Sequence, residues 1–464
     1  AIGVREKAAL LASLAMAEQG LERWDAVSAN LREALDIYVS LGDREMIGRT
    51  FTELTDALFF AGRLEETAET ARRALAYTQA DANANRVRLL ATLGLANGAA
   101  GAYQAADEAL QDGLKIASQL SDPKLEARVL GARLTVNSLF FRLREAAADG
   151  FRCEQLGGSE TPPWQRSLQL RVLHQTLLYL GRREEALRIV DELEPLARKI
   201  GDVFTAARCD STRAWTEFGG APDLAKLETG LEQVSRYGQG EQAGFWEAVF
   251  RAQLSLLDFF RGNWTGALSL ARASCRHEVG SAVEGIGVGT LFRLMGYAGD
   301  RDGALAILEE KSALIPRSGQ PNAAGSWWML ALVIEGFAML NERARAAELY
   351  PLARELVSVG AVSLWPILRF TQTIAGVAAS AAKEWEAAEG HFKIALRQAE
   401  SFPDRLEQAE IRRFHAMMLI DRSAAGDREK ARMMLGEALE SYTQIGMARH
   451  VEMARALLDQ RAGE

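Results

Sequence analysis

Cys275, His277 and Glu278 place a thiol, an imidazole and a carboxylate within one short segment. Such a group could support nucleophilic or acid–base catalysis. The segment falls at the end of a predicted helix, which favours a simpler interpretation: a histidine that interacts with the helix dipole. The other histidines are scattered along the chain, and five histidines in all argue against a metal site. An enzyme with an unrecognised site near His277 is kept as the third hypothesis for this chain.

Motifs for nucleotide or metal chemistry are missing from the sequence. It has neither a Gly-x4-Gly-Lys-Ser/Thr phosphate loop nor a His-Glu-x-x-His motif. Gly285-Ile-Gly287-Val-Gly289 resembles a dinucleotide fingerprint but lacks its last glycine and lies within a predicted helix. Those glycines indicate close helix packing or a locally loosened helix instead. We therefore predict no catalytic residue, no metal and no cofactor.

Tryptophans gather early in the first helices of the later predicted hairpins, and they are the best candidates for binding. Beside the glycine-rich segment 285–289, which would leave room, they could form a pocket for a peptide or small ligand with nearby arginines supplying polar contacts. The predicted ligand-binding or partner-binding residues are Phe245, Trp246, Arg251, Arg293, Trp327, Trp328, Trp365 and Arg369. The alternative is that these tryptophans belong to the core between helices.

A sequence pattern repeats roughly every 40 residues, and the helices of each repeat are the elements that must position these side chains. Glycine or asparagine marks the turn inside most hairpins, since both residues enter a left-handed helix stop at low cost. The turn residues are Gly20, Gly62, Gly101, Gly181, Gly262, Gly299, Asn341 and Gly426. A small residue follows most of these turns five positions later, as Ala106 and Ala186 do. The pattern predicts stacked helical hairpins.

The predicted fold is all-α: a right-handed superhelical solenoid of about eleven hairpins resembling tetratricopeptide (TPR) repeats, plus a C-terminal capping helix. The hairpins are expected to start near residues 4, 45, 83, 122, 163, 203, 242, 281, 322, 363 and 404. The repeat array is predicted to span residues 1–446, and the capping helix residues 447–464. No linker rich in proline, serine or charge divides the chain, so one continuous array is expected.

The amino-acid composition limits the kinds of partner and the cellular environment that can be expected for this chain. A net charge of −8 argues against nucleic acid, because phosphate binding needs a basic face. The basic cluster of the last repeat, Arg405 to Arg432, is offset by acidic residues such as Glu407 and Glu410, which favours a solvated helix face. The three cysteines, Cys153, Cys209 and Cys275, lack metal-ligand spacing and favour a reduced, cytoplasmic protein. The longest apolar run, residues 327–340, is too short to span a membrane.

Two turn motifs carry a family resemblance. Gly101-Ala-Tyr103-Gln-Ala105-Ala106 and Gly262-Asn-Trp264-Thr-Gly266-Ala267 resemble the tetratricopeptide turn of glycine, aromatic and alanine. The closing stretch from Gly426 to Leu458 resembles the C-terminal repeat of bacterial multidomain regulators. Those regulators join a nucleotide cyclase or a LuxR/MalT-type DNA-binding domain to an ATPase module and a repeat array. The resemblance implies that this chain is the sensing or partner-binding array, attached to ATPase and effector domains that it does not itself contain.

Three functions follow as expectations. The first is a non-catalytic sensing or protein-interaction module of a larger bacterial signalling regulator, which binds a protein, a peptide or a small ligand on its concave face. The second is a free-standing scaffold that assembles partner proteins. The third is the enzyme named above.

Overall fold

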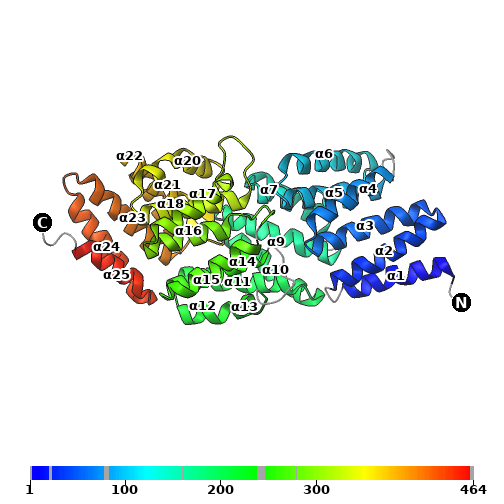
Figure 1. Cartoon of the computed structure of the whole chain (residues 1–464), viewed down its shortest axis with the longest axis horizontal. Coiled ribbons are helices and arrows are strands. Elements are labelled where there is room, and N and C mark those ends of the chain that lie inside the picture. Colours follow the sequence, from blue (N-terminus) through cyan, green and yellow to red (C-terminus); the bar gives the residue numbers. More distant parts are fainter. Residues whose placement is uncertain are drawn as a thin grey trace. The chain divides into compact units, whose positions relative to one another are not determined.

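A computed structural model describes residues 3–19, 23–77, 83–158, 161–237, 246–277 and 279–459. Helices alternate as the first and second members of successive hairpins (Figure 1). The first helices are α1 (Val4–Gln19), α3 (Arg44–Phe60), α5 (Ala84–Ala99), α7 (Pro123–Leu139), α9 (Pro163–Tyr179), α11 (Val203–Gly220), α14 (Trp246–Phe260), α16 (Ile286–Ala298), α18 (Ala324–Met339), α21 (Thr371–Ala381) and α23 (Arg405–Arg422).

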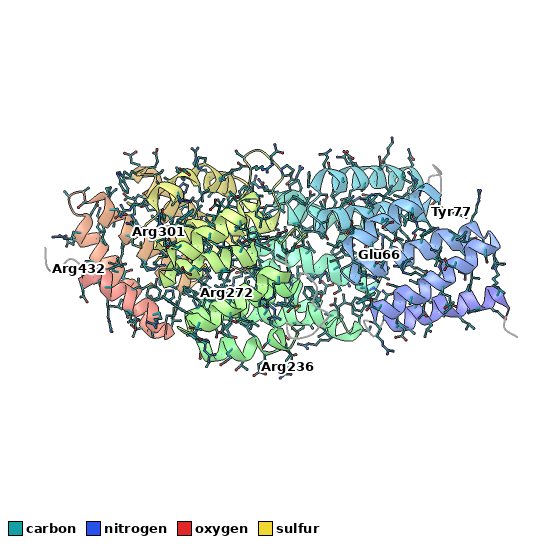
Figure 2. The ribbon with its side chains drawn as sticks, viewed as in Figure 1. Glu66, Tyr77, Arg236, Arg272, Arg301 and Arg432 are labelled. Carbon is teal, nitrogen blue, oxygen red and sulfur yellow. The ribbon has the colours of Figure 1, made fainter. Side chains whose placement is uncertain are left out.

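The second helices complete the hairpins, and some are split in two. They are α2 (Trp24–Leu41), α4 (Leu64–Tyr77), α6 (Tyr103–Leu120), α8 (Leu143–Leu156), α10 (Arg183–Ile200), α12 (Leu224–Gly230) with α13 (Glu232–Tyr237), α15 (Trp264–His277), α17 (Arg301–Glu310), α19 (Arg343–Glu348) with α20 (Tyr350–Ser358), α22 (Trp385–Ser401) and α24 (Asp427–Ile445). They also carry exposed charge, such as Arg236 and Arg432 (Figure 2). The prediction of an all-α array of TPR-like hairpins with a C-terminal helix, α25 (Ala448–Asp459), is confirmed.

Left-handed residues end the first helices where the sequence predicts. Gly62 has a φ of 74° and Gly181 a φ of 73°, and Asn341 replaces glycine with a φ of 58°. The fourth and tenth hairpins, for which the sequence offers no glycine, turn at Phe141 and Lys383 with φ of 57° and 61°. A side chain in this region is strained, so packing must hold those two turns in place.

The chain divides into two compact units. Unit 1 comprises residues 1–176, 188–206 and 280–282, and unit 2 comprises residues 177–187, 207–279 and 283–464. In unit 1 the first helices lie side by side, because α5 contacts both α3 and α7. In unit 2 the first helices α16, α18, α21 and α23 follow one another in the same way. Each unit therefore presents a row of first helices.

Two predicted helix starts are wrong. The eighth hairpin was expected to begin near 281, but Gly285 has a φ of 118° and α16 begins only at Ile286. The tenth was expected near 363, where the chain instead forms two short antiparallel strands, β1 (Ser363–Leu364) and β2 (Arg369–Phe370). The turn between them contains a cis peptide bond at Trp365–Pro366, and α21 starts at Thr371. Proline disfavours the helical conformation of the residue before it, so Trp365 is not expected to continue a helix into Pro366.

The strand pair is buried within unit 2. Its residues Leu364, Ile367 and Phe370 are almost fully buried, and the backbone N–H of Val362 donates to the carbonyl oxygen of Tyr179 at 2.6 Å. Thr371 at the start of α21 donates its hydroxyl to the carbonyl oxygen of Ala361 at 2.6 Å. These bonds fix β2, and with it Arg369, in the interior of unit 2.

The C-terminal helix α25 contacts more than the last hairpin. His450 packs edge-on against Phe259 of α14, with ring centroids 4.9 Å apart, and its ring is tilted against that of Tyr442 of α24 at 5.3 Å. Arg449 lies 5.6 Å from the ring of Trp264 at the start of α15. Within unit 2, α25 therefore joins the last hairpin to the seventh.

Candidate functional site

The predicted tryptophans lie in the packed interior of unit 2. Trp327 and Trp328 on α18 are 2% and 1% exposed, and Trp365 in the strand turn is 6% exposed. Side chains so thoroughly buried favour the alternative interpretation, in which they form the core between helices. Their part in binding stays a prediction.

Four residues singled out above fall wholly or partly outside the described part of the chain. Phe245 and Glu278 lie outside the described residues, and so do the side chains of Trp246 and His277. Arg251 is described: its Nε donates to Glu247 Oε1 at 2.6 Å on the same face of α14. Arg251 and Glu247 thus pair along one helix, whereas Arg293 and Arg369 belong to a different group of side chains.

The glycine-rich segment does not leave room, contrary to expectation. A Cβ at Gly289 would lie 2.9 Å from the Cα of Met329, and one at Gly285 would lie 2.6 Å from the carbonyl oxygen of Gly325. Helix α18 fills the space that these glycines open. Close helix packing, the other interpretation of the segment, is the correct one.

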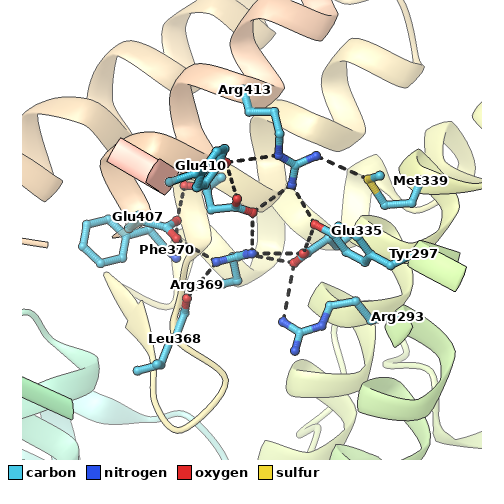
Figure 3. A network of polar contacts seen from close by, with 12 residues as sticks. Arg293, Tyr297, Glu335, Met339, Leu368, Arg369, Phe370, Glu407, Glu410 and Arg413 are labelled. Carbon is cyan, nitrogen blue, oxygen red and sulfur yellow. Dashed lines mark hydrogen bonds and ion pairs between the residues drawn. The ribbon is translucent and has the colours of Figure 1, made fainter. Parts of the chain in front are cut away.

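Arg369 is the centre of a buried network of charges in unit 2 (Figure 3). Its Nε lies 2.8 Å from Glu335 Oε2, its Nη1 3.1 Å from Glu407 Oε2 and its Nη2 2.7 Å from Glu410 Oε2. Burial opposes its charge, but the three carboxylates outweigh burial and hold the pKa of Arg369 well above its ordinary value. One strand residue thus joins helices α18 and α23.

Arg413 extends the network toward the neighbouring hairpins. Its Nη2 donates to Glu410 Oε2 at 2.8 Å and to the hydroxyl oxygen of Tyr297 at 2.7 Å, and its Nε donates to Tyr442 at 3.3 Å. Tyr442 in turn donates to Glu410. The charges of Arg413 and Arg369 outweigh burial and depress the pKa of Glu410. Glu410 therefore stays ionised in the interior.

Arg293 lies at the edge of the network, where its charge is least compensated. The carboxylate of Glu335 is 3.9 Å from its Nη1, and its guanidinium lies 5.2 Å from the ring centre of Phe259. Its Nε and Nη1 make no hydrogen bond to protein. Burial lowers the pKa of Arg293. A cation in such surroundings is costly to the fold, because a buried charge normally requires close partners.

The prediction of a solvated charged face on the last repeat is wrong for the residues of this network. Glu407, Glu410 and Arg413 on α23 are each at most 1% exposed. Their spacing of three residues puts them on the face of α23 that also carries Phe414 and Met417, toward the interior. The sequence did contain a signal of their burial, because these charged residues fall in register with apolar residues of α23.

A second group of polar side chains crosses the first helices of unit 1. Asp56 on α3, Thr92 on α5, Arg128 on α7 and Gln165 on α9 recur at intervals of 36 or 37 residues, and we call them the polar ladder. The Thr92 hydroxyl donates to Asp56 Oδ1 at 2.6 Å. Arg128 donates through Nη2 to both carboxylate oxygens of Asp56, at 2.6 and 2.7 Å, and through Nη1 to Gln165 Oε1 at 3.2 Å.

The polar ladder remains partly accessible. The side chains of Arg128 and Asp56 are 19% and 30% exposed. Both line a cavity of about 130 Å³ whose walls also include Glu53, Phe60 and Trp164. Trp24, Phe60 and Trp164 pack together beside it, with ring centroids 5.3 to 6.2 Å apart. Aromatic, acidic and basic groups thus meet at one place that a partner can reach.

The described residues were also compared with the requirements of a metal site and of a reactive thiol. No three His, Cys, Asp or Glu side chains there lie close enough together to hold a metal ion. Cys153 and Cys209 are buried and Cys275 is partly buried, and burial raises the pKa of Cys153 to about 12. In the part of the chain that the structure describes, no helix is long and apolar enough to cross a membrane.

Comparisons with known proteins return solved structures only. Neither a protein-family model nor a curated protein matches the chain. It is similar to yeast Tom70, with 12% identity over 98% of this chain and 96% of that one, at a TM-score of 0.35. It is also similar to the TPR domain of P58(IPK), with 14% identity over 90% and 99% and a TM-score of 0.25. The Cut9–Hcn1 hetero-tetramer of the APC/C shows 11% identity over 97% and 96%, with a TM-score of 0.27. At such values the likeness carries no argument about function.

Proposed function

We propose that this chain is a non-catalytic helical-repeat module that binds a protein or peptide partner through the first-helix face of unit 1. The observation that carries the proposal is the polar ladder, which offers hydrogen-bonding groups from four successive hairpins in one row. Its side chains are ordered by one another before any partner arrives, which lowers the entropic cost of binding.

The cavity beside the ladder supports a peptide as the partner. A space of about 130 Å³ is small for a whole cofactor but suits one side chain of an extended segment. Phe60 and Trp164 would contact its apolar part, and Glu53 its polar end. Repeat modules commonly use extended concave surfaces in this way.

The wider assignment rests on the sequence resemblance. In it, residues 1–446 form the array and residues 447–464 its cap, and the module senses or recruits partners for a larger cytoplasmic bacterial regulator with ATPase and effector domains. A free-standing adaptor that assembles partner proteins is supported about equally well. Both versions require the same face to bind protein.

The test replaces one residue of the polar ladder. Arg128→Gln removes the cation that holds Asp56 and Gln165 in line, and Arg152→Gln on α8 of the same hairpin is the matched control, since Arg152 is 53% exposed. A photo-crosslinking residue at Glu53 traps the partner in lysate for mass spectrometry. We expect Arg128→Gln to lose the partner and Arg152→Gln to retain it, with circular dichroism unchanged in both. Equal capture by the two variants would refute the proposal.

A further inference from the structure

A second cavity lies in unit 2, against the outer side of the buried charge network. Its volume is about 580 Å³, within the range of sites for small molecules. Its walls come from α18, α19, α21, α23 and α25, and their apolar side chains include Met339, Val377, Phe414, Met417, Met453 and Leu457. We call it the methionine cavity.

Arg413 is a buried charged residue that lines this cavity. Its side chain is 1% exposed, and its Nε and Nη2 are already bound to Tyr442, Tyr297 and Glu410. Its Nη1 donates to two thioethers, with Met339 Sδ at 3.4 Å and Met417 Sδ at 3.9 Å, and its guanidinium carbon lies 4.2 Å from the ring centre of Phe414. Thioether sulfur is a weak acceptor, whereas buried guanidinium N–H groups normally meet oxygen.

We propose that the methionine cavity binds a small monocarboxylate with an apolar body, whose carboxylate accepts hydrogen bonds from Nη1 of Arg413. Methionine side chains are flexible enough to move aside and give Nη1 to the ligand. The apolar body then contacts Phe414, Met453 and Leu457. Arg343, which also lines the cavity, pairs with Asp421 at 2.7 Å, so its guanidinium competes less for the carboxylate.

The charges of the network agree with an anionic ligand. Three arginines, Arg293, Arg369 and Arg413, face three glutamates, and burial raises the pKa of one of them, Glu407, to about 7. When Glu407 carries a proton, the network has a surplus positive charge. A carboxylate on Arg413 compensates it.

The test uses three probes with the same eight-carbon chain: octanoate, 1-octanol and octylammonium. Isothermal titration on the whole chain should show one octanoate site, 1-octanol weaker by about tenfold or more, and no saturable binding of octylammonium. Equal affinity for octanoate and 1-octanol would mean a purely apolar cavity and would overturn the proposal. So would the absence of octanoate binding.

Two substitutions test whether octanoate binds in the methionine cavity. Met453→Trp on α25 and Ala381→Phe on α21 fill the methionine cavity from two different helices and replace no residue of the charge network, and each should abolish octanoate binding. Met433→Trp is the matched control, because Met433 on α24 is 58% exposed and lies outside the cavity. Thermal melts check that all three variants fold. Octanoate binding that survives in both cavity variants would assign it elsewhere and reject the proposal. The outcome is independent of partner capture by unit 1.

Discussion

Arg369 on β2 and Glu335 on α18 form a two-bond ion pair that is closed to solvent. Nε lies 2.8 Å from Oε2 and Nη2 3.0 Å from Oε1, and the two side chains are 1% and 0% exposed. Parallel bonds of this kind give both strength and a fixed geometry. Because Glu407 and Glu410 share the same guanidinium, the loss of Arg369 would leave three carboxylates inside unit 2.

Arg369→Met should therefore destabilise unit 2 by about 3–5 kcal/mol, since breaking a buried pair leaves uncompensated charge. Urea denaturation followed by circular dichroism measures the loss. Arg301→Met is the control: Arg301 is 54% exposed and pairs with Glu342 near the surface, so its removal should cost no more than about 1 kcal/mol. Similar costs for the two variants would show that the network contributes little.

Gly289→Ala should destabilise the protein by about 1–3 kcal/mol, because the added methyl would meet the backbone of α18 at Met329. Gly436 in the middle of α24 has no neighbouring atom within 4 Å of the point where a Cβ would lie. Gly436→Ala should accordingly stabilise by about 0.5–1 kcal/mol. Opposite signs in thermal denaturation confirm that helix contact, and not helix propensity, selects the glycine at 289.

Trp328→Ala should cost about 3–5 kcal/mol, as large-to-small changes in a core do. Met433→Ala on exposed α24 should stay within about 0.5 kcal/mol. The melting temperature and the helical circular dichroism decide between the two roles of the tryptophans. A folded, equally stable Trp328→Ala protein that no longer binds its partner would restore the pocket interpretation.

His450→Phe should reduce the loss of folding stability that occurs as the pH is lowered below about 6.5. Burial lowers the pKa of His450 to about 3, and the facing charges of Glu410, Arg413, Arg369 and Glu335 shift it less. The unfolded chain takes up this proton near pH 6.5, so stability present above that pH is lost as pH falls toward 3. The loss is at most about 1.4 kcal/mol per pH unit. Phenylalanine suits the surrounding rings and cannot titrate, so urea midpoints of the variant should fall less between pH 6.5 and 5.

Glu407→Gln should change the pH dependence of folding stability at higher pH, where the wild type loses stability as the pH rises. Burial raises the pKa of Glu407 from 4.5 to about 7, so the folded protein holds a proton that the unfolded chain has released. The stability from this group is present below pH 4.5 and is lost as pH rises through 7. Between pH 5 and 7 the variant should therefore gain stability relative to the wild type as pH increases. A constant difference across this range would contradict a protonated Glu407.

The hairpin array could be predicted because its signals are local. Gly62, Gly181 and Gly262 each end a helix by themselves, and no distant residue is needed to recognise them. The strand pair at 363–370 could not be predicted in this way. Its bonds to Tyr179 and Glu407 come from segments far away in the sequence, and the helical spacing of apolar residues there gave no warning.

The charge network was missed for a similar reason. Arg369 meets Glu335 and Glu407 across separations of 34 and 38 residues, which is one repeat in either direction. In a single sequence such charges look like ordinary solvated positions. A search for opposite charges one repeat apart on the apolar face of successive first helices would have found them. The same search at two repeats would have found Asp56 and Arg128, which are 72 residues apart.

The contacts of α25 change how unit 2 must unfold. In an open array of repeats each hairpin meets only its neighbours, and the end hairpins fray first. Here His450 and Arg449 return to Phe259 and Trp264, so the last helix stabilises a hairpin from the middle of the chain. Fraying from the C-terminus would break that distant contact at once. Unit 2 should therefore lose its structure in a single cooperative transition, with hydrogen-exchange protection as high in α25 as in α14.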